Sequence, residues 1–335
     1  MKSKTSTLLT GIKPTGTPHL GNYLGAIRPA IEMSNSYDQS LVFIADYHAL
    51  NTVQNGKLLH ELTISIAATW LACGLDPSKV IIFKQSAIPE VFELSVILNS
   101  LTPKGWMNKA HAYKAAVDGN LKNHKDNDDG INMGLYTYPI LMAADILLYG
   151  TNVVPAGKDQ RQHIEIARDI AQRFNNVYKR QVFNMPEALI CEDIEAVPGT
   201  DGRKMSKSYN NTIPLFATNS EWREVIKKIP TDSSRLDEPK DVSSSILFDI
   251  YKSIADKECV RSVKDKLERG DMGWGQLKHY LENLLDEKFS HYGQKYNEYI
   301  SSPEYVEGIL LDGAKKARTI AENNLKEVRK VIGSL

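Results

Sequence analysis

The sequence contains few cysteines. Its 335 residues include three, Cys73, Cys191 and Cys259. They are odd in number, far apart and outside any Cys-x-x-Cys pair, so neither a disulfide framework nor a cysteine zinc site is expected. This excludes the small disulfide-stabilised secreted domains as a class. We expect buried free thiols in a reducing cytosol.

Long apolar runs and an excess of one charge are also missing. No stretch approaches the roughly 20 apolar residues that a membrane-spanning helix requires. The first residues contain no apolar segment typical of a signal peptide. We therefore expect a cytoplasmic protein without a membrane partner. Lys+Arg and Asp+Glu each number 41, so the net charge is zero. This argues against a protein that coats DNA, whereas a local basic face for RNA stays compatible with it.

The first half of the chain alternates short apolar runs with longer helical patterns. Such an alternation predicts an α/β fold, a doubly wound parallel sheet that binds ligands at the carboxyl ends of its strands. The predicted strands cover residues 8–12, 41–45, 80–83 and 152–155. The predicted helices cover residues 58–71, 137–149 and 159–174. Residues 118–130 are polar and predict a loop, and residues 186–218 show no regular pattern.

The remainder of the chain shows only helical patterns. Thr218 and Glu221 have the spacing of a capping box ahead of a helix that stops at Pro230. Further helices are predicted over residues 244–268, 274–289, 303–311 and 314–332. Gly273 and Gly275 follow no strand, so we interpret them as a turn rather than a dinucleotide loop. We expect an α/β domain over residues 1–218 and an all-α domain over residues 219–335.

A glycine-rich turn follows the first predicted strand, over residues 11–25 (GIKPTGTPHLGNYLG). His19 and Asn22 lie three residues apart on the first helical turn, so they point the same way. Gly21 has no side chain, which leaves room for a flat ring against the backbone. Free N–H groups and the helix dipole favour an anion there. The turn fits a nucleotide's base and phosphates. An ordinary strand-to-helix turn with a packed or capping histidine is the alternative.

A second motif lies in residues 201–211 (DGRKMSKSYNN). Lys204 and Lys207 flank small hydroxylated residues on a loop. Lysine is a point charge on a flexible stem, which suits a loop that closes on a polyphosphate and then opens again. The alternative is a solvated basic loop without a ligand.

The two motifs together, about 185 residues apart on an α/β chain, resemble the paired signatures of the class I aminoacyl-tRNA synthetases. Residues 19–22 (HLGN) resemble the His-Ile-Gly-His element. Residues 204–208 match the Lys-Met-Ser-Lys-Ser element letter for letter. The resemblance implies a Rossmann-like catalytic core with a C-terminal all-α domain, ATP as a substrate, and Mg²⁺ that ATP carries.

Three further segments narrow the amino acid. Residues 138–149 (YPILMAADILLY) resemble the specificity helix of the bacterial tryptophanyl-tRNA synthetases, and residues 154–163 (VPAGKDQRQH) resemble that family's segment at the ATP ribose. Residues 313–318 (GAKKAR) extend the likeness to the C-terminus. The resemblance implies formation of tryptophanyl-adenylate and pyrophosphate from L-tryptophan and ATP, then transfer to the terminal 2′-hydroxyl of tRNA(Trp). It also implies a homodimer formed through a helical insertion at residues 103–180, and anticodon recognition by residues 219–335.

Asp145 is the central residue of the predicted amino-acid pocket. Tryptophan offers a large apolar ring with one N–H donor, so a selective pocket needs apolar walls and one buried acceptor. Asp145 stands in an otherwise apolar helix, where an unpaired buried charge would be costly. The resemblance assigns it the indole N–H, with Met142 on the same face touching the ring. An exposed aspartate on the polar side of an amphipathic helix is the alternative.

The other site residues follow from the resemblance. The remaining predicted contacts of the amino acid are Tyr138, Gln160, His48, Leu9 and Val154. The predicted contacts of ATP are Gly11, Lys13, Thr15, His19, Gly21, Asn22, Gly157, Asp159, Lys204, Met205, Ser206, Lys207 and Ser208. Lys204, Lys207, His19 and Asn22 would stabilise phosphate charge, since the reaction needs no protein nucleophile and no metal bound by the protein.

Some positions depart from the family's pattern. Leu9 stands where an aromatic residue is common, Lys13 where glutamine is common, and Lys158 where an acidic residue is usual. The cation that approaches pyrophosphate from the middle of the chain is either Lys109 or Lys114. These departures concern the rim of the pocket rather than the reaction.

Three alternatives stay open. A tyrosyl-tRNA synthetase shares both motifs but needs a pocket for a phenolic hydroxyl. A non-charging paralogue would bind tRNA or tryptophan without catalysis, and it would show an eroded lysine loop or a truncated helical domain. A small-substrate nucleotidyltransferase would have no use for residues 219–335.

Overall fold

The structure is a computed structural model that describes residues 5–157, 160–190 and 197–335. Its centre is a parallel five-stranded sheet with the strand order β3-β2-β1-β4-β5. The strands are β1 (Thr7–Ile12), β2 (Gln39–Ile44), β3 (Ile81–Lys84), β4 (Val153–Ala156) and β5 (Glu187–Ile190). The four predicted strands are confirmed. β5 lies in a region where we expected no regular element, because its short segment carries no long apolar run. Among the described residues it pairs with β4 alone.

The sheet reverses its order at β1. β2 and β3 follow on one side of β1, and β4 and β5 follow on the other. Leu9 pairs with Leu41 and Ile12 with Ile44, and Leu8 pairs with Val153 across the other edge of β1. Crevices at such a reversal point, outside the carboxyl ends of the strands, are where open α/β sheets bind ligands. The doubly wound α/β fold class is confirmed.

The chain forms two compact units. Unit 1 comprises residues 1–16, 30–191 and 302–335, and unit 2 comprises residues 17–29 and 192–301. These bounds differ from the expected division at residue 218. The last helix, α14 (Pro303–Ile332), belongs to the unit of the sheet, and residues 17–25 of the first motif belong to the mainly helical unit. Tertiary packing, rather than a change in sequence pattern, decides where each segment belongs.

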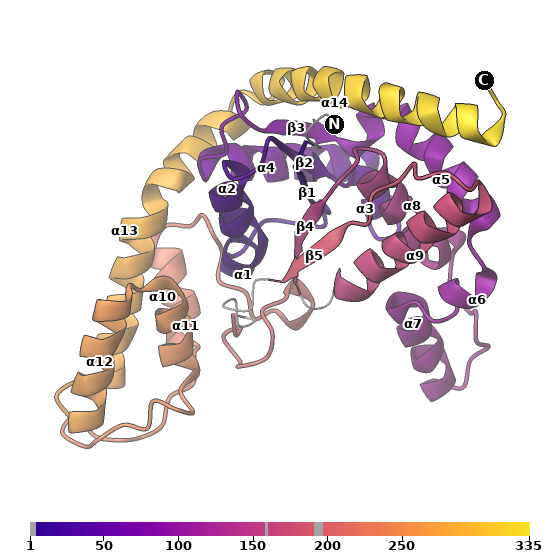
Figure 1. Cartoon of the computed structure of the whole chain (residues 1–335). Helices are drawn as coiled ribbons and strands as arrows, with labels where there is room; N and C mark the ends of the chain where they lie inside the picture. Colours follow the sequence, from indigo (N-terminus) through magenta and orange to yellow (C-terminus); the bar gives the residue numbers. More distant parts are fainter. Residues whose placement is uncertain (1–4, 158–159, 191–196) are drawn as a thin grey trace. The chain divides into compact units, whose positions relative to one another are not determined.

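Helices surround the sheet of unit 1. In Figure 1, α5, α8 and α9 lie beside one another, and α14 crosses next to β3. These four helices share one apolar core with the strands. The helices of unit 1 are α3 (Asp46–Ala49), α4 (Gly56–Ala72), the 3₁₀ turn η2 (Gln85–Ala87), α5 (Pro89–Leu101), α6 (Lys104–Met107), α7 (His111–Lys122), α8 (Met133–Leu147), α9 (Arg161–Val177) and α14, with α2 (Arg28–Ser34) joining the two units in sequence.

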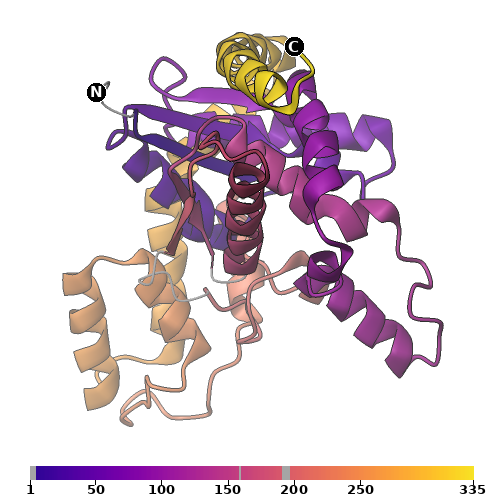
Figure 2. The same cartoon turned by 45° about the vertical axis from the view of Figure 1, so that its right-hand side comes forward.

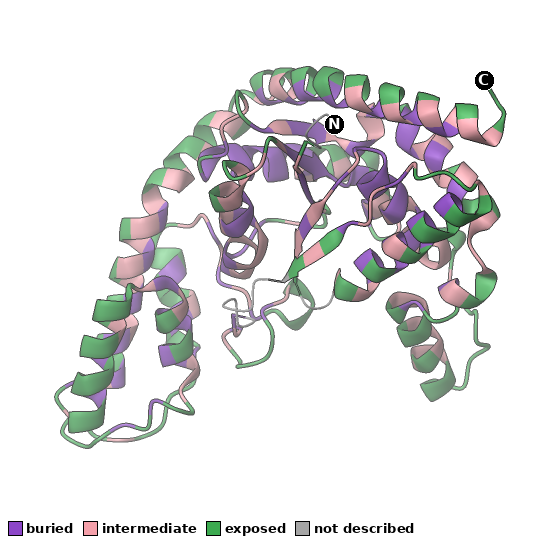
Figure 3. Cartoon of the chain, viewed as in Figure 1, coloured by how far each residue is buried: buried purple, intermediate pink, exposed green. Residues whose placement is uncertain are grey.

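Helix α14 is one continuous helix, where we expected two. Figure 3 shows that it buries one side toward the sheet and leaves the other exposed. The join between the two expected helices falls at Gly313. A Cβ at this position would lie 1.8 Å from the backbone oxygen of Ile82, so only glycine lets the helix approach β3 this closely.

Helix α7 extends away from the sheet of unit 1 (Figures 1 and 2). It occupies residues 111–122 and buries none of them within the described chain. The prediction of a loop over residues 118–130 is therefore wrong for its first part. The polar composition of this stretch reflects exposure rather than the absence of a helix.

Unit 2 is mainly helical. Its elements are α1 (Leu20–Asn22), the π-helical turn η1 (Tyr23–Ile27), the 3₁₀ turn η4 (Lys207–Tyr209), α10 (Asn219–Lys227), α11 (Ile246–Ile254), α12 (Lys257–Arg269) and α13 (Trp274–Ile300). The capping box of Thr218 and Glu221 is confirmed at the start of α10. The helix expected over residues 244–268 is two helices, α11 and α12, and α13 begins directly after Gly273. None of the helices in the described residues is long and apolar enough to cross a membrane.

Candidate functional site

The first motif forms a tight helical start in unit 2. The backbone N–H of His19 donates to Oδ1 of Asn22 at 3.1 Å, and the backbone N–H of Leu20 donates to the carbonyl of Ile213 at 2.9 Å. A Cβ at Gly21 would lie 3.1 Å from Nδ1 of His19 and 3.4 Å from the Cβ of Met205. A larger residue than glycine would therefore press on the ring of His19.

The second motif is a loop closed by one asparagine. Oδ1 of Asn211 accepts from the backbone N–H of Ser206 at 2.7 Å, and its Nδ2 donates to Oδ1 of Asp201 at 2.7 Å and to the carbonyl of Lys204 at 3.2 Å. Asn210 completes the turn in the left-handed conformation, with φ of 51°. Ser208 lies in the 3₁₀ turn η4 and is exposed. Asn211 was not among the predicted site residues. Its position directly after the lysine motif was the only signal for it in the sequence.

The two motifs are in contact. The backbone N–H of Gly21 donates to the sulfur of Met205 at 3.3 Å, across 184 residues of sequence. Burial lowers the pKa of His19 to about 4, and the charge of Lys207 adds to this effect. Burial also lowers the pKa of Lys207 to about 8. At neutral pH the pair thus presents a neutral imidazole beside an ammonium group, an arrangement that can donate hydrogen bonds and positive charge to phosphate oxygens.

In unit 1, Asp145 lies on α8 and is only 2% exposed. Its Oδ2 is 2.9 Å from Nε2 of His48. Nε2 of Gln85 donates to both of its oxygens, at 3.0 Å to Oδ1 and 2.9 Å to Oδ2. Burial raises the pKa of Asp145, and the bonds from His48 and Gln85 oppose this. The carboxylate is recessed among apolar neighbours, as expected, and the alternative of an exposed aspartate is wrong.

A second polar chain lies on α8 and α9. The hydroxyl of Tyr138 contacts Nε2 of His163, whose Nδ1 is 3.1 Å from Oε1 of Gln160. Burial raises the pKa of Tyr138 to about 12, so the phenol stays protonated. The rings of Tyr138 and His48 meet edge to face with centroids 6.4 Å apart, which brings the two chains together. His163 was missed as a site residue, although its segment had been recognised.

The apolar residues of the predicted pocket form part of the core of unit 1. Leu9 and Val154 are buried at 1% and 5% exposure, and Met142 packs against the same cluster. Gly11, at the end of β1, faces the ring of Phe43. A Cβ there would lie 2.5 Å from Cε1 of Phe43. Glycine is thus required at the carboxyl end of β1 by a neighbour on β2.

The remaining predicted contacts of ATP include residues that take part in local backbone hydrogen bonds. Thr15 donates its backbone N–H to the carbonyl of Lys13 at 3.0 Å, and desolvation lowers the pKa of Lys13. The carbonyl of Gly157 accepts from the backbone N–H of Gln160 at 2.9 Å. Lys109 and Lys114 are both exposed, so their geometry does not choose between them. Asp159 and Lys158 lie outside the described residues.

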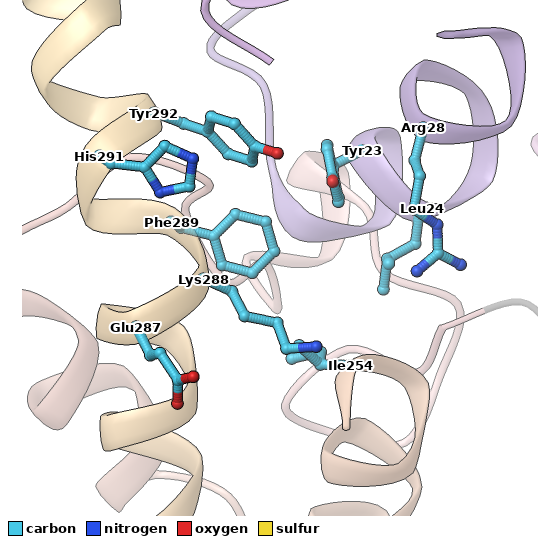
Figure 4. A pocket seen from close by; sticks show the side chains of 9 residues that line it. All are labelled: Tyr23, Leu24, Arg28, Ile254, Glu287, Lys288, Phe289, His291 and Tyr292. Carbon is cyan, nitrogen blue, oxygen red and sulfur yellow. The ribbon is translucent and has the colours of Figure 1, made fainter. Parts of the chain in front are cut away.

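Unit 2 also contains a cavity of about 390 Å³ between η1 and α13 (Figure 4). Tyr23 meets Phe289 edge to face with ring centroids 5.1 Å apart. The charged residues that line the cavity are Arg28, Lys288 and Glu287. Lys288 itself lies 3.3 Å from a carboxylate oxygen of Asp256. The charges around the cavity therefore balance, and they select neither an anionic nor a cationic ligand.

Comparison with known proteins decides the family. The family model of class I tRNA synthetases (W and Y) matches residues 1–290. A tryptophan–tRNA ligase of Pseudomonas aeruginosa is 48% identical, over 98% of this chain and 74% of its own length. That of Neisseria meningitidis is 46% identical over 97% of both chains. The chain belongs to the tryptophanyl-tRNA synthetase family. It is an aminoacyl-tRNA ligase that activates tryptophan with ATP and transfers it to tRNA.

A solved structure agrees with this assignment. The tryptophanyl-tRNA synthetase of Campylobacter jejuni, crystallised with ADP and tryptophan, has a TM-score of 0.88 and 41% identity, over 98% of this chain and 99% of its own. The predicted family, reaction and nucleotide class are thereby confirmed.

Proposed function

We propose that Asp145, Met142, Leu9 and Val154 line a slot for the tryptophan ring and that the carboxylate of Asp145 accepts the indole N–H. The observation that supports this is a carboxylate with 2% exposure in an apolar helix, held by donors on one side. Leu9, Val154 and Met142 supply the apolar walls. Tyr138 and Gln160 would hold the ammonium and carboxylate of the amino acid, joined by the hydrogen-bonding ring of His163.

The first and second motifs would bind the ATP phosphates. The tryptophan carboxylate attacks the α-phosphate in line, and pyrophosphate leaves. Lys204 and Lys207 would neutralise charge on pyrophosphate, while His19 and Asn22 would stabilise the region of the α-phosphate. Such positioning and charge stabilisation supply the rate without a protein nucleophile. Gly11, Lys13, Thr15, Gly157 and Asp159 would line the nucleoside.

Mg²⁺ would arrive with ATP rather than on the protein. It prefers near-octahedral oxygen ligands and is commonly bound through substrate phosphates. When bound it would neutralise phosphate charge together with Lys204 and Lys207. We further propose that residues 219–335 read the anticodon of tRNA(Trp) and that the enzyme acts in the cytoplasm.

We propose a homodimer formed through residues 103–180. The support is the helix α7, which buries none of its residues within the described chain. Leu121, at its end, is 54% exposed, and Met133, at the start of α8, is 68% exposed. Exposed apolar surface of this kind favours a protein partner. Replacing both Leu121 and Met133 by aspartate should yield a monomer in light scattering, whereas Leu311→Asp, at a similarly exposed position on α14, should leave the dimer intact.

The choice of substrate is tested by pyrophosphate exchange. Exchange should depend on tryptophan and be slower by orders of magnitude with tyrosine, because in the proposed slot the carboxylate of Asp145 would accept the indole N–H. Faster exchange with tyrosine would overturn the assignment of the slot. Aminoacylation with each of the twenty amino acids gives the complete specificity.

A further inference from the structure

Gln85 is the most completely enclosed polar residue near the slot. It follows β3 as the first residue of η2 and has 0% exposure. Its amide nitrogen donates to both carboxylate oxygens of Asp145. Its neighbour Ser86 donates its backbone N–H to Asp46 at 3.0 Å, and its hydroxyl contacts the same carboxylate. The turn that contains Gln85 is therefore tied to α3.

A backbone group fixes which way the amide of Gln85 points. The N–H of His48 donates to Oε1 of Gln85 at 3.3 Å. The amide oxygen thus faces α3 and the amide nitrogen faces Asp145. The reversed amide would place two oxygens against each other in a buried site, which is unfavourable. Since Nε2 of His48 also contacts Asp145, the three residues form a closed ring of hydrogen bonds.

The ring leaves Asp145 with room for one more donor. A carboxylate offers about four lone-pair sites. Within the described residues, Oδ1 is engaged once, by Gln85, and Oδ2 twice, by Gln85 and His48. The open site is therefore on Oδ1. A single open acceptor matches the indole ring, which carries a single N–H.

The ring also opposes protonation of Asp145. Burial raises its pKa, and so does the nearby charge of Asp46, whereas His48 and Gln85 lower it. A protonated carboxyl would present an O–H toward the slot instead of an open acceptor. Without the Gln85 donor, the carboxylate would be less firmly oriented and would be protonated more easily.

We propose that Gln85 is a positioning residue for substrate specificity: it aims Oδ1 of Asp145 at the indole nitrogen, so that the enzyme distinguishes tryptophan from a ring of the same shape without an N–H. The proposal rests on the role of Asp145 proposed above. It concerns a residue that acts through Asp145 and does not itself touch the substrate.

The experiment compares two substrates of nearly equal shape in pyrophosphate exchange. One is tryptophan, and the other is 3-(3-benzothienyl)-L-alanine, in which sulfur replaces the ring N–H. The wild-type enzyme should prefer tryptophan about ten- to hundredfold in kcat/KM, the range for a hydrogen bond to a charged group. Gln85→Met keeps the length of the side chain but removes its donor. It should raise KM for tryptophan, leave kcat nearly unchanged, and bring the preference to within about threefold of unity.

Two further variants make the result specific. Gln85→Asn keeps an amide on a side chain that is one methylene shorter, so the amide is withdrawn from Asp145. This variant should show the same loss of preference, and it serves as the test if the methionine variant does not fold. Gln172→Met carries the same substitution on the exposed side of α9, and its preference should equal that of the wild type. Thermal unfolding of each variant shows that the fold is retained.

Two different outcomes overturn two different claims. A folded Gln85→Met enzyme with the wild-type preference would overturn the proposal for Gln85 and leave the role of Asp145 standing. A wild-type enzyme that uses both substrates equally would overturn the role of Asp145 and the proposal for Gln85 together. Exchange with tryptophan itself would persist in either case, so the reaction is not in question.

Discussion

At the scale of the residue, two enclosed polar side chains form the centre of the proposed amino-acid site. Asp145 and Gln85 are almost completely enclosed, and each is stabilised by the other. The sequence indicated Asp145, because a carboxylate buried among apolar helix residues is costly unless it has a partner. It did not indicate Gln85, because a glutamine after a short strand has many ordinary explanations. Only the distance between the two side chains shows that they are hydrogen-bonded to each other.

Replacement of Asp145 tests the slot at this scale. Asp145→Ala should lower kcat/KM for tryptophan. The loss corresponds to about 2–3 kcal/mol of transition-state stabilisation, since a charge-assisted hydrogen bond to the indole disappears. Preference over the benzothienyl analogue should disappear with it. Steady-state exchange kinetics with both substrates measure the loss. An unchanged tryptophan preference would show that the indole is recognised elsewhere.

The lowered pKa of Lys207 predicts that the activity depends on pH. Burial lowers its pKa to about 8, so the ammonium is charged below that pH and is lost as the pH rises through it. In the free enzyme, kcat/KM for ATP should therefore decline above about pH 8. Lys207→Arg stays charged in this range and should remove the decline, whatever its effect on the maximal rate. Exchange assays between about pH 6.5 and 9.5 make the comparison, and a decline of equal midpoint in both enzymes would contradict it.

At the scale of elements, long patterns were predicted well and joins between elements were not. The strands β2 and β3 contain continuous apolar runs, because helices cover both faces of a parallel sheet. β5 was missed since its four residues gain their order from pairing with β4. The break expected near Gly313 reflects a glycine that serves packing, and the helix continues through it.

Gly313 offers a prediction on α14. Gly313→Ala should lower the free energy of unfolding by about 1–3 kcal/mol, because its Cβ would collide with the backbone of β3. Gly308→Ala is the matched control on the same helix, where a Cβ meets no atom within 4 Å. It should raise stability by about 0.5–1 kcal/mol through helix propensity. Denaturant unfolding distinguishes the two, and equal effects would contradict the role of the close approach.

At the scale of the whole molecule, the chain leaves the sheet unit and returns to it. α14 contributes Val306, Leu310, Leu325 and Val328 as buried side chains. Ion pairs of Arg318 with Glu90 and of Arg329 with Glu93 connect it to α5. A division of the chain by pattern alone assigns this helix to the wrong neighbours, because a helical stripe does not say which surface it covers.

Truncation tests this return of the chain. A chain ending at residue 301 should lose several kcal/mol of stability in unit 1, since four large apolar side chains leave the core. This is comparable with the total stability of an ordinary domain, so we expect insolubility or a broad transition. Removal of residues 333–335, which are exposed, should leave Tm unchanged. Thermal unfolding with and without tryptophan measures both, and a truncated chain with the wild-type Tm would contradict the packing of α14.

The sequence by itself determined the fold class, the two nucleotide motifs and the buried aspartate, because each depends on residue types at fixed local spacings. Tertiary structure alone decided that the two motifs touch through Gly21 and Met205, that Gln85 contacts Asp145 and His163 contacts Tyr138, and that the last helix packs on β3. Those contacts join residues from 25 to more than 200 positions apart. The energies of these contacts depend on distance and burial in three dimensions, and the local spacing of residue types does not contain that information.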